Sequence, residues 1–434
     1  MVNECINKKK VQWDVIISIY IYRVLLDWCY FSLIVPNYGY YGFEDNRSII
    51  TYIISWIVLI FFSFLMERII SDEKPMFSNI TIFVLTLISV VPFSTLICSG
   101  ILSDKFIVMN AIYWLAVITL CLFIRKIKIK PKVITIGTKI IDAKIAMIFG
   151  IFSVAFVIFL SYKYTHFRLN FNLFNVYELR AEAKNYNFPR IFQYLFPWTR
   201  VLNIIFLAYA CKNNKKILAI IFFLAQMLSF GIDGLKSTFF MPFLVIFICA
   251  FYKNGNFKYY KKMAVWGING LLLFGIMEYI IFGTYNIVNI IIRRVLIIPA
   301  YLNYCYVDFF SSHDAAIFGF KTQYDKLGNI IGELYFNRPD MNCNNGLISD
   351  AVANLGTVGI VLMPILLIIV LRILDNCTVD LDEKIFFTVA IYFAVILSNS
   401  FLTTSLITHG LAIAGIVLLM LRSKRRKENY EKIE

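Results

Sequence analysis

Long apolar segments recur along the whole chain of 434 residues, and they limit what it can fold into. Each is close to the roughly 20 apolar residues that a helix needs to cross a bilayer. The short alternating strands of a membrane β-barrel are not visible. The pattern predicts an all-α polytopic membrane protein with a single integral membrane domain over 1–434. We expect about twelve spans, near 14–35, 49–66, 78–98, 106–124, 143–162, 191–210, 217–232, 237–252, 264–282, 351–371, 385–399 and 403–421.

Composition supports this class. Hydrophobic residues make up 60% of the chain and charged residues only 16%, whereas soluble domains carry about 25% charged residues. A soluble enzyme and a disordered chain are therefore excluded. The net charge of +15 could indicate a nucleic-acid partner, but in a membrane protein basic residues collect on the cytoplasmic side. We therefore expect no nucleic-acid partner.

The basic residues predict the orientation. Alternate connections hold 26 of the 42 Lys and Arg residues, and the remaining connections hold 13. Both termini are therefore expected in the cytoplasm, with an even number of spans. The segments placed inside are 8–10, 67–77, 125–142, 211–216, 253–263, 372–384 and the basic tail 422–434.

Two connections on the outer side are long, at about 163–190 and about 283–349. The second contains an apolar stretch that is long enough for another span. Arg293 and Arg294 in its middle, with Pro299 just after them, favour a short interfacial or re-entrant helix instead. Long loops in a compact protein are usually functional.

Ionisable residues inside predicted spans are costly and usually have a structural or functional reason. Arg23 has Asp27 four residues further on, which predicts a pair within one helix. Arg200 lies in mid-span without an acid at helical spacing, so its partner is on another helix, on a ligand or in a water-filled cavity. Asp233 and Lys236 are close enough to pair with each other.

The outer loops also carry arginines. The first loop has charges of alternating sign, which fit either a solvated helical face or an anion grip by Arg180. These charges are Glu178, Arg180, Glu182 and Lys184. The adjacent Arg293 and Arg294 repel each other unless an anion or carboxylate lies between them. They could bind a lipid headgroup or a substrate anion.

Three residues are candidates for proton transfer. Asp350 could be the N-cap of the span that follows it, or a base. His409 lies about six residues into the last span and could either bond a backbone carbonyl or act as a base, since its pKa is ordinarily near neutrality. Glu333 is an acid of the second outer loop.

The sequence predicts no metal or cofactor. Its nine cysteines form no C-x-x-C pair or Cys/His cluster, and nucleotide-binding and hydrolase motifs are absent. The acidic stretch 380–383 resembles a metal-binding D-x-D but is expected to be a solvated cytoplasmic loop. Cys305 and Cys343 share the second outer loop, where oxidising conditions would permit a disulfide.

Four sequence patterns in order resemble the Wzy-type O-antigen and capsular-polysaccharide polymerases, also called oligosaccharide repeat unit polymerases. They are YELRAEA at 177–183, RRVLIIPAYLNYCYVDFF at 293–310, NNGLISDAVANLGTVGIV at 344–361 and LTTSLITHGL at 402–411. The similarity in arrangement covers the whole chain. The resemblance implies a GT-C-like fold in the bacterial cytoplasmic membrane.

The implied reaction joins oligosaccharide repeat units carried on undecaprenyl diphosphate at the outer face of that membrane. On this resemblance, the arginines would hold the departing diphosphate, and one of three residues would be the base. The expected clamp is Arg180, Arg293, Arg294 and Arg200, and the candidate bases are His409, Asp350 and Glu333. The implied partners are membrane lipid, the lipid-linked oligosaccharide, and a chain-length regulator and flippase of the same pathway.

Three other functions remain open from the sequence. An O-antigen ligase differs only in its acceptor. A flippase for the same lipid-linked oligosaccharide would have short outer loops and pseudo-symmetric halves, which the long second loop disfavours. A passive scaffold would not need Arg200 within the membrane.

Overall fold

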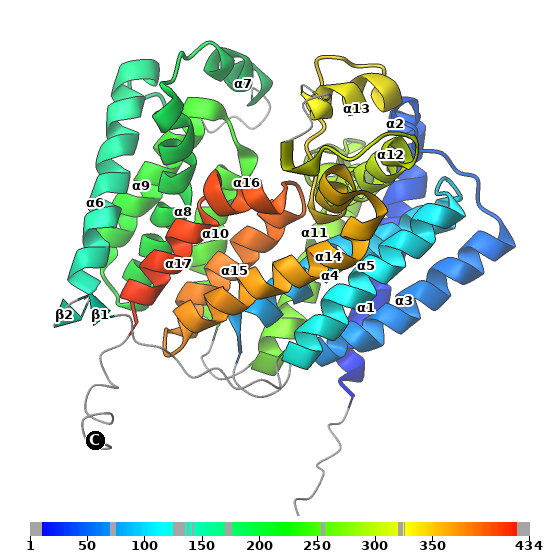
Figure 1. Ribbon diagram of the computed structural model, residues 1–434, viewed down its shortest axis with the longest axis horizontal. Helices are drawn as coiled ribbons and strands as arrows, with labels where there is room; N and C mark the ends of the chain where they lie inside the picture. The colour runs from blue at the N-terminus through cyan, green and yellow to red at the C-terminus, as the bar shows by residue number, and fades with distance from the viewer. Residues whose placement is uncertain are drawn as a thin grey trace, which may run out of the picture. The chain divides into compact units, whose positions relative to one another are not determined.

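The computed structural model describes residues 11–69, 75–124, 135–136, 139–140, 143–169, 176–252, 257–319, 324 and 326–422 (Figure 1). In this part of the chain, eleven helices are long and apolar enough to cross a membrane. The predicted all-α polytopic class is therefore confirmed. The basic segments at 8–10 and 125–132, and the tail after Arg422, lie outside the described residues.

All twelve predicted apolar runs are helical, and the last of them, at 403–421, is divided between two helices. A segment in lipid must satisfy its own backbone hydrogen bonds, so an apolar run of this length becomes helical. Two of the helices are short: α10 (Lys236–Phe251) has 16 residues and α15 (Glu383–Leu397) has 15. At about 1.5 Å per residue each rises about 24 Å, less than the roughly 30 Å of hydrocarbon.

The chain forms two compact units. Unit 1 comprises Met1–Glu73, Phe83–Leu122 and Phe257–Leu362, and unit 2 comprises Lys74–Ile82, Phe123–Asn256 and Met363–Glu434. The helices α4 (Phe77–Ser99) and α14 (Leu347–Thr378) are divided between the units.

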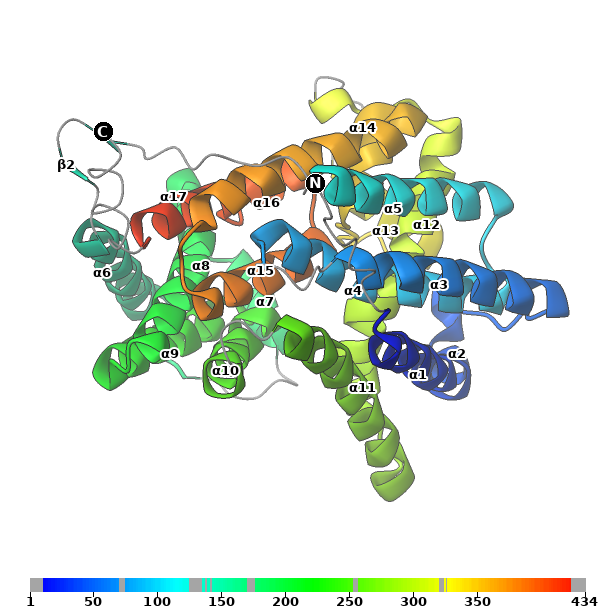
Figure 2. The same ribbon diagram turned by 90° about the horizontal axis from the view of Figure 1, so that it is seen from below.

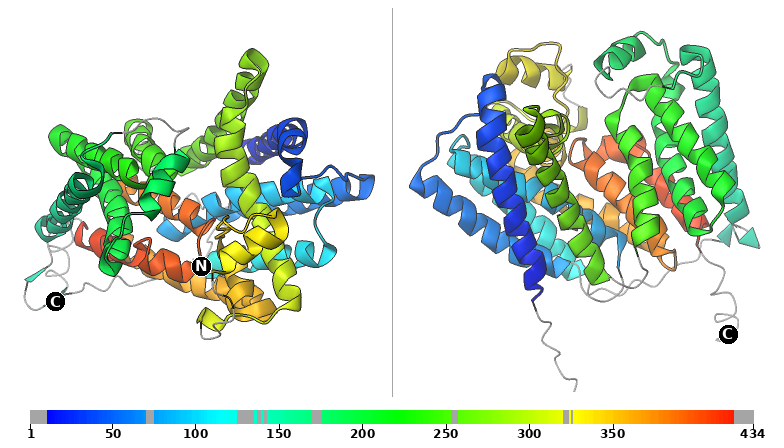
Figure 3. Two further views of the ribbon diagram at one scale, coloured as in Figure 1. Left: turned by 90° about the horizontal axis from the view of Figure 1, so that it is seen from above. Right: turned by 180° about the vertical axis from the view of Figure 1, so that it is seen from behind.

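Unit 1 is built around helices from both ends of its sequence. In it α1 (Trp13–Cys29) and α11 (Phe257–Phe282) run side by side, as the right panel of Figure 3 shows. The side chain of Asn269 donates to the backbone carbonyl of Ser18 across this contact, at 3.0 Å. Its other elements are η1 (Tyr30–Ile34), α2 (Val35–Tyr38), η2 (Gly39–Tyr41), α3 (Ile49–Ile69), α5 (Asp104–Ile124), η4 (Val288–Ile297), α12 (Ile298–Ser312), η5 (Ile317–Gly319) and α13 (Leu327–Phe336).

The intrahelical pair predicted in α1 is present. Arg23 is fully buried, and its Nε donates to Asp27 Oδ1 at 2.6 Å. The other guanidinium nitrogens donate to the hydroxyls of Ser94 (2.9 Å) and Ser55 (3.3 Å). This cation is held by a carboxylate and by hydroxyls of two other helices.

The apolar stretch of the second predicted outer loop is longer than the short helix we expected. Here η4 and α12 are continuous over Val288–Ser312, 25 residues that could cross a membrane by length and composition. Both halves nevertheless contact other elements of unit 1 through aromatic side chains. In the first half Arg293 lies over the ring of Tyr38, at the end of α2, and in the second Tyr304 packs against Phe106, at the start of α5.

Those two contact points belong to the same end of the unit because the loops beside them are bonded together. The backbone N–H of Asn46, in the loop after η2, donates to the carbonyl of Ser99, in the turn before α5, at 2.8 Å. The helix therefore runs along one end of unit 1. The assignment of 283–349 to the outer face stays a prediction.

In unit 2, α8 (Arg190–Lys212) occupies the centre. It contacts α6 (Ala143–Leu160), α9 (Lys216–Asp233), α10, α15 and α17 (Leu411–Met420), and Figure 2 shows α8, α9 and α10 grouped together. The remaining elements are η3 (Ser161–Thr165), α7 (Val176–Lys184), α16 (Leu402–Ile407) and a two-residue antiparallel hairpin of β1 (Thr135–Ile136) and β2 (Lys139–Ile140).

The acidic stretch 380–383 has a structural role in unit 2, rather than being only a solvated loop. Asp382 is the N-cap of α15, and its side chain accepts a hydrogen bond from the backbone N–H of Lys384. The Tyr252 hydroxyl donates to the Glu383 carboxylate. These acids therefore hold one end of α15 in place.

Candidate functional site

A buried ion pair joins two central helices of unit 2. Arg200 of α8 donates through Nη2 to Asp233 at the end of α9, and its guanidinium lies 4.4 Å from the ring centroid of Phe196. The Arg200 side chain is 7% exposed and that of Asp233 is 25% exposed. We expected the partner of Arg200 on another helix, on a ligand or in a water-filled cavity, and the structure places one on another helix. The pairing of Asp233 with Arg200 corrects the expected role of Asp233 as a partner for Lys236 alone.

One donor of Arg200 is not used. Its Nε is buried and has no hydrogen-bond partner among the described residues. A buried donor without a partner costs free energy, so it marks a place where a ligand acceptor or an ordered water would be favourable.

The helix α7 is fixed over the end of α9 by two glycines. A side chain at Gly231 would collide with the backbone carbonyl of Arg168. Gly234 has φ +63°, and a side chain there would press against Leu179 of α7. Arg168 also pairs with Glu182 of α7 at 2.9 Å. The first outer loop is therefore anchored to α9 at two places, at Arg168 before α7 and at α7 itself.

This docking places Arg180 beside the buried pair. Its side chain is half-buried, and burial lowers the pKa of its guanidinium, an effect that Asp233 opposes and Arg200 reinforces. Of the charged residues of α7, Glu178 and Lys184 are exposed, as expected of a solvated face. Arg180 is instead half-buried and interacts electrostatically with Asp233 and Arg200. Its anion grip stays a prediction.

His409 lies in a turn and not inside a continuous helix. The predicted last span breaks into α16 and α17, because Gly410 has φ +80° and lies against Trp198 and Val201 of α8. The half-buried imidazole is within 3.1 Å of the Ser400 hydroxyl through Nε2. The partner of this imidazole nitrogen is therefore a side-chain hydroxyl, whereas one of our expectations was a backbone carbonyl.

Four of these residues are linked by electrostatic interactions within unit 2. Arg180 and His409 both interact electrostatically with Arg200, and Asp233 with both arginines. We call Arg180, Arg200, Asp233 and His409 the unit 2 cluster. It has two guanidinium groups for one carboxylate, so it is suited to an anionic ligand.

In unit 1, Arg293 is buried against aromatic rings. Its guanidinium lies 4.0 Å from the ring centroid of Tyr38 and 5.6 Å from that of Tyr41. It also donates to Asn289 Oδ1, at 2.7 Å from Nη2. Rings and an amide therefore stabilise this cation, whereas we expected an anion or carboxylate. Arg294 is half-buried in the same π-helical segment.

Asp350 is fully buried and is not the N-cap of its helix. That prediction is wrong because α14 begins three residues earlier, at Leu347. The Asp350 carboxylate accepts from the side chain of Asn354 at 2.5 Å. Nearby, Asn345 Nδ2 donates to Asn303 Oδ1 at 2.9 Å.

Glu333, the third candidate base, is exposed on α13.

The disulfide that the second outer loop would permit is not formed in the structure. Cys305 and Cys343 are both buried free thiols. The carbonyl of Cys343 instead accepts from the Tyr306 hydroxyl at 3.1 Å.

The comparisons with known proteins add no relative. No family model, no curated protein and no solved structure matches this chain. Its function therefore has to be inferred from the residues and contacts themselves.

Two features of these sites were missed from the sequence. Asp233 is 33 positions from Arg200, and no periodicity relates residues so far apart. The tyrosines at 38–41 were also missed, although their alternation with glycine in YGYYGF is a visible signal of a tight, aromatic turn.

Proposed function

We propose that this chain is a bacterial cytoplasmic-membrane glycosyltransferase that polymerises oligosaccharide repeat units carried on undecaprenyl diphosphate. The observation that carries the proposal is the unit 2 cluster, in which Arg180 and His409 both interact electrostatically with the buried Arg200. The resemblance of the sequence to repeat-unit polymerases supplies the substrate class.

The proposed chemistry is a displacement at a sugar carbon. A hydroxyl of one lipid-linked unit attacks the anomeric carbon of another, and the bond from that carbon to the diphosphate oxygen breaks. The electron pair leaves with the diphosphate, and the hydroxyl proton passes to a base. The product is a longer glycan on one lipid and a free lipid diphosphate.

Each residue of the cluster has a role in this step. Arg180 and the unused Nε of Arg200 would donate to the departing diphosphate, where preorganised donors stabilise the developing charge. Neutral His409 would accept the hydroxyl proton. Asp233 positions Arg200. Arg293 and Arg294 remain candidates for a second cationic site, and Asp350 and Glu333 remain alternative bases.

The decisive experiment is extension of a purified lipid-diphosphate repeat unit by the full-length protein in proteoliposomes. We expect a ladder of products from the wild-type chain. His409→Ala should lower the rate by about 10²–10⁴-fold, the usual contribution of a general base. Arg180→Lys should also lose activity although it keeps the positive charge, because Lys lacks the planar guanidinium that binds two phosphate oxygens at once.

Matched controls separate these effects from damage to the fold. His313→Ala replaces an exposed histidine of unit 1, and Arg190→Lys replaces an exposed arginine of unit 2; both should retain the ladder.

The same assay separates the other functions. Transfer only to a different acceptor would indicate a ligase, and movement of the lipid without a new glycosidic bond would indicate a flippase. A normal ladder in His409→Ala would move the base to Asp350 or Glu333.

A further inference from the structure

Three tyrosines gather on a tight turn at one end of unit 1. The turn is η2, where Gly42 follows with φ +82°. The ring centroids of Tyr40 and Tyr41 are 4.3 Å apart, and those of Tyr38 and Tyr40 are 6.2 Å apart. Tyr40 is 72% exposed. Tyr40 therefore offers a ring to the outside while its neighbours support it.

The tyrosines are held by cations on other elements. Arg293 of η4 lies against the ring of Tyr38, and Arg338, which follows α13, donates to the Tyr41 hydroxyl at 3.0 Å. The contact of the Arg293 guanidinium with an aromatic ring is favourable, and Arg338 adds a hydrogen bond. We call Tyr38, Tyr40, Tyr41, Arg293 and Arg338 the aromatic surface.

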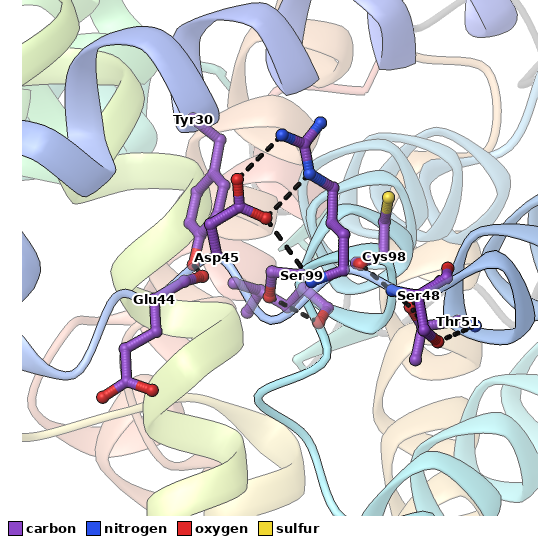
Figure 4. Close-up of polar contacts among 9 residues, drawn as sticks. Tyr30, Glu44, Asp45, Ser48, Thr51, Cys98 and Ser99 are labelled. Carbon is purple, nitrogen blue, oxygen red and sulfur yellow. Dashed lines mark hydrogen bonds and ion pairs between the residues drawn. The ribbon is translucent and has the colours of Figure 1, made fainter.

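The chain that follows the turn is also anchored. Asp45 pairs with Arg47 at 2.7 Å. The Tyr30 hydroxyl donates to the backbone carbonyl of Glu44 at 3.3 Å, and both residues are labelled in Figure 4. The backbone bond from Asn46 to Ser99 closes the loop. The aromatic surface is therefore preorganised, which lowers the entropic cost of binding a ligand.

The chemistry of this surface matches a saccharide. A sugar presents C–H groups on its ring face and hydroxyls at its edge. Tyr40 offers an exposed ring for the face, while the phenol hydroxyls and the exposed Arg338 offer hydrogen-bond partners for the edge. A phosphate group would gain little from the rings, and the Arg338 Nε already has Asp340 at 3.9 Å.

We propose that the aromatic surface binds a saccharide, namely the glycan part of the lipid-linked substrate. The choice of this glycan rests on the function proposed above. The surface would hold the sugars of a growing or incoming unit and would act by binding, without contacting the reacting atoms.

The test measures binding directly and does not depend on turnover. The probe is the repeat-unit oligosaccharide of the same cells, released from its lipid by mild acid. Its binding to the full-length protein in nanodiscs is followed by saturation-transfer NMR and by titration. Tyr40→Leu removes the ring but keeps an apolar side chain, and we expect it to weaken binding about tenfold, as loss of an aromatic contact does.

Two variants serve as matched controls. Tyr40→Phe keeps the ring and should bind within about twofold of the wild type. Tyr162→Leu removes a tyrosine of unit 2 that is 65% exposed and should not change binding. Equal binding by Tyr40→Leu and the wild type would overturn the proposal. The proposal would also be overturned if Tyr40→Leu lost binding only in proportion to a lower yield of inserted protein. That result is expected if Tyr40 merely anchors the chain at the lipid interface.

The two proposals fail separately. Binding that depends on Tyr40, without any extension of the lipid-linked unit, would reject the polymerase and keep the saccharide site. Extension with an unchanged product ladder and unchanged binding in Tyr40→Leu would keep the polymerase and reject the site.

Discussion

At the scale of single residues, buried charge is the main constraint in this chain. Arg23 is fully buried and held by an acid of its own helix. Arg200 is paired with an acid of a neighbouring helix and keeps one donor unused. A fully satisfied cation is sufficiently explained by structure, whereas an incompletely satisfied one is a better candidate for ligand binding.

Removing the carboxylate from the Arg200 pair should destabilise unit 2. Asp233→Asn leaves a buried guanidinium without a counter-charge, and we expect a loss of about 3 kcal/mol in the free energy of unfolding. Thermal unfolding in detergent would measure it. Replacing both partners, with Arg200→Met and Asp233→Leu, should recover most of the loss.

The control for that variant is Asp340→Asn, at a side chain that is 76% exposed. It should change the unfolding free energy by no more than about 0.5 kcal/mol. If Asp233→Asn unfolds at the wild-type temperature, the pair does not stabilise the fold.

At the scale of elements, α7 is the segment on which the unit 2 cluster depends, because it carries Arg180. Its docking uses Gly231 in the last turn of α9, Gly234 just after that helix, and a network of Arg168, Glu182 and Tyr186. The hydrogen bonds from Tyr186 and Arg168 lower the pKa of Glu182. Burial, with the Glu182 bond, raises the pKa of Tyr186 to about 12.

The docking of α7 should therefore weaken in acid. A carboxylate whose pKa is lower in the folded state stabilises it above its unfolded pKa of about 4.3. That contribution is lost as the pH falls through the lower, folded value. Since the pair is partly exposed, the effect should be within about 1 kcal/mol. Hydrogen exchange of the α7 amides between pH 6 and pH 3 would measure it.

Glu182→Gln provides the control for this prediction. Its α7 amides should be less protected at pH 6, by a small factor, and should show little further change on acidification. Equal pH dependence in the variant and the wild type would mean that another group controls the docking.

At the scale of the whole molecule, the basic residues and the contacts of η4 and α12 agree on the topology. The charge distribution predicts cytoplasmic termini and outer loops at 163–190 and 283–349. Within unit 1, Val288–Ser312 contacts Tyr38 at the end of α2 and Phe106 at the start of α5, which favours a helix that lies along one end of the unit over one that crosses.

Cysteine accessibility in intact cells tests this topology. Single cysteines placed at 184 and 340, in a background without the native ones, should react with a membrane-impermeant reagent. Cysteines at 128 and 425 should react only after the membrane is permeabilised. Labelling at 184 but not at 340, with outward labelling at 425, would show that Val288–Ser312 crosses the membrane.

The sequence by itself determined the class and the positions of the twelve apolar helical runs, because hydropathy is a local property and backbone groups in lipid must bond within their own segment. It also located the pair in α1, whose members are four residues apart. Tertiary structure alone decided the partner of Arg200, the burial of Asp350, the break at His409 and the joining of Tyr38 to Arg293. Each of these depends on side chains from segments far apart in sequence, and only helix packing brings such groups together.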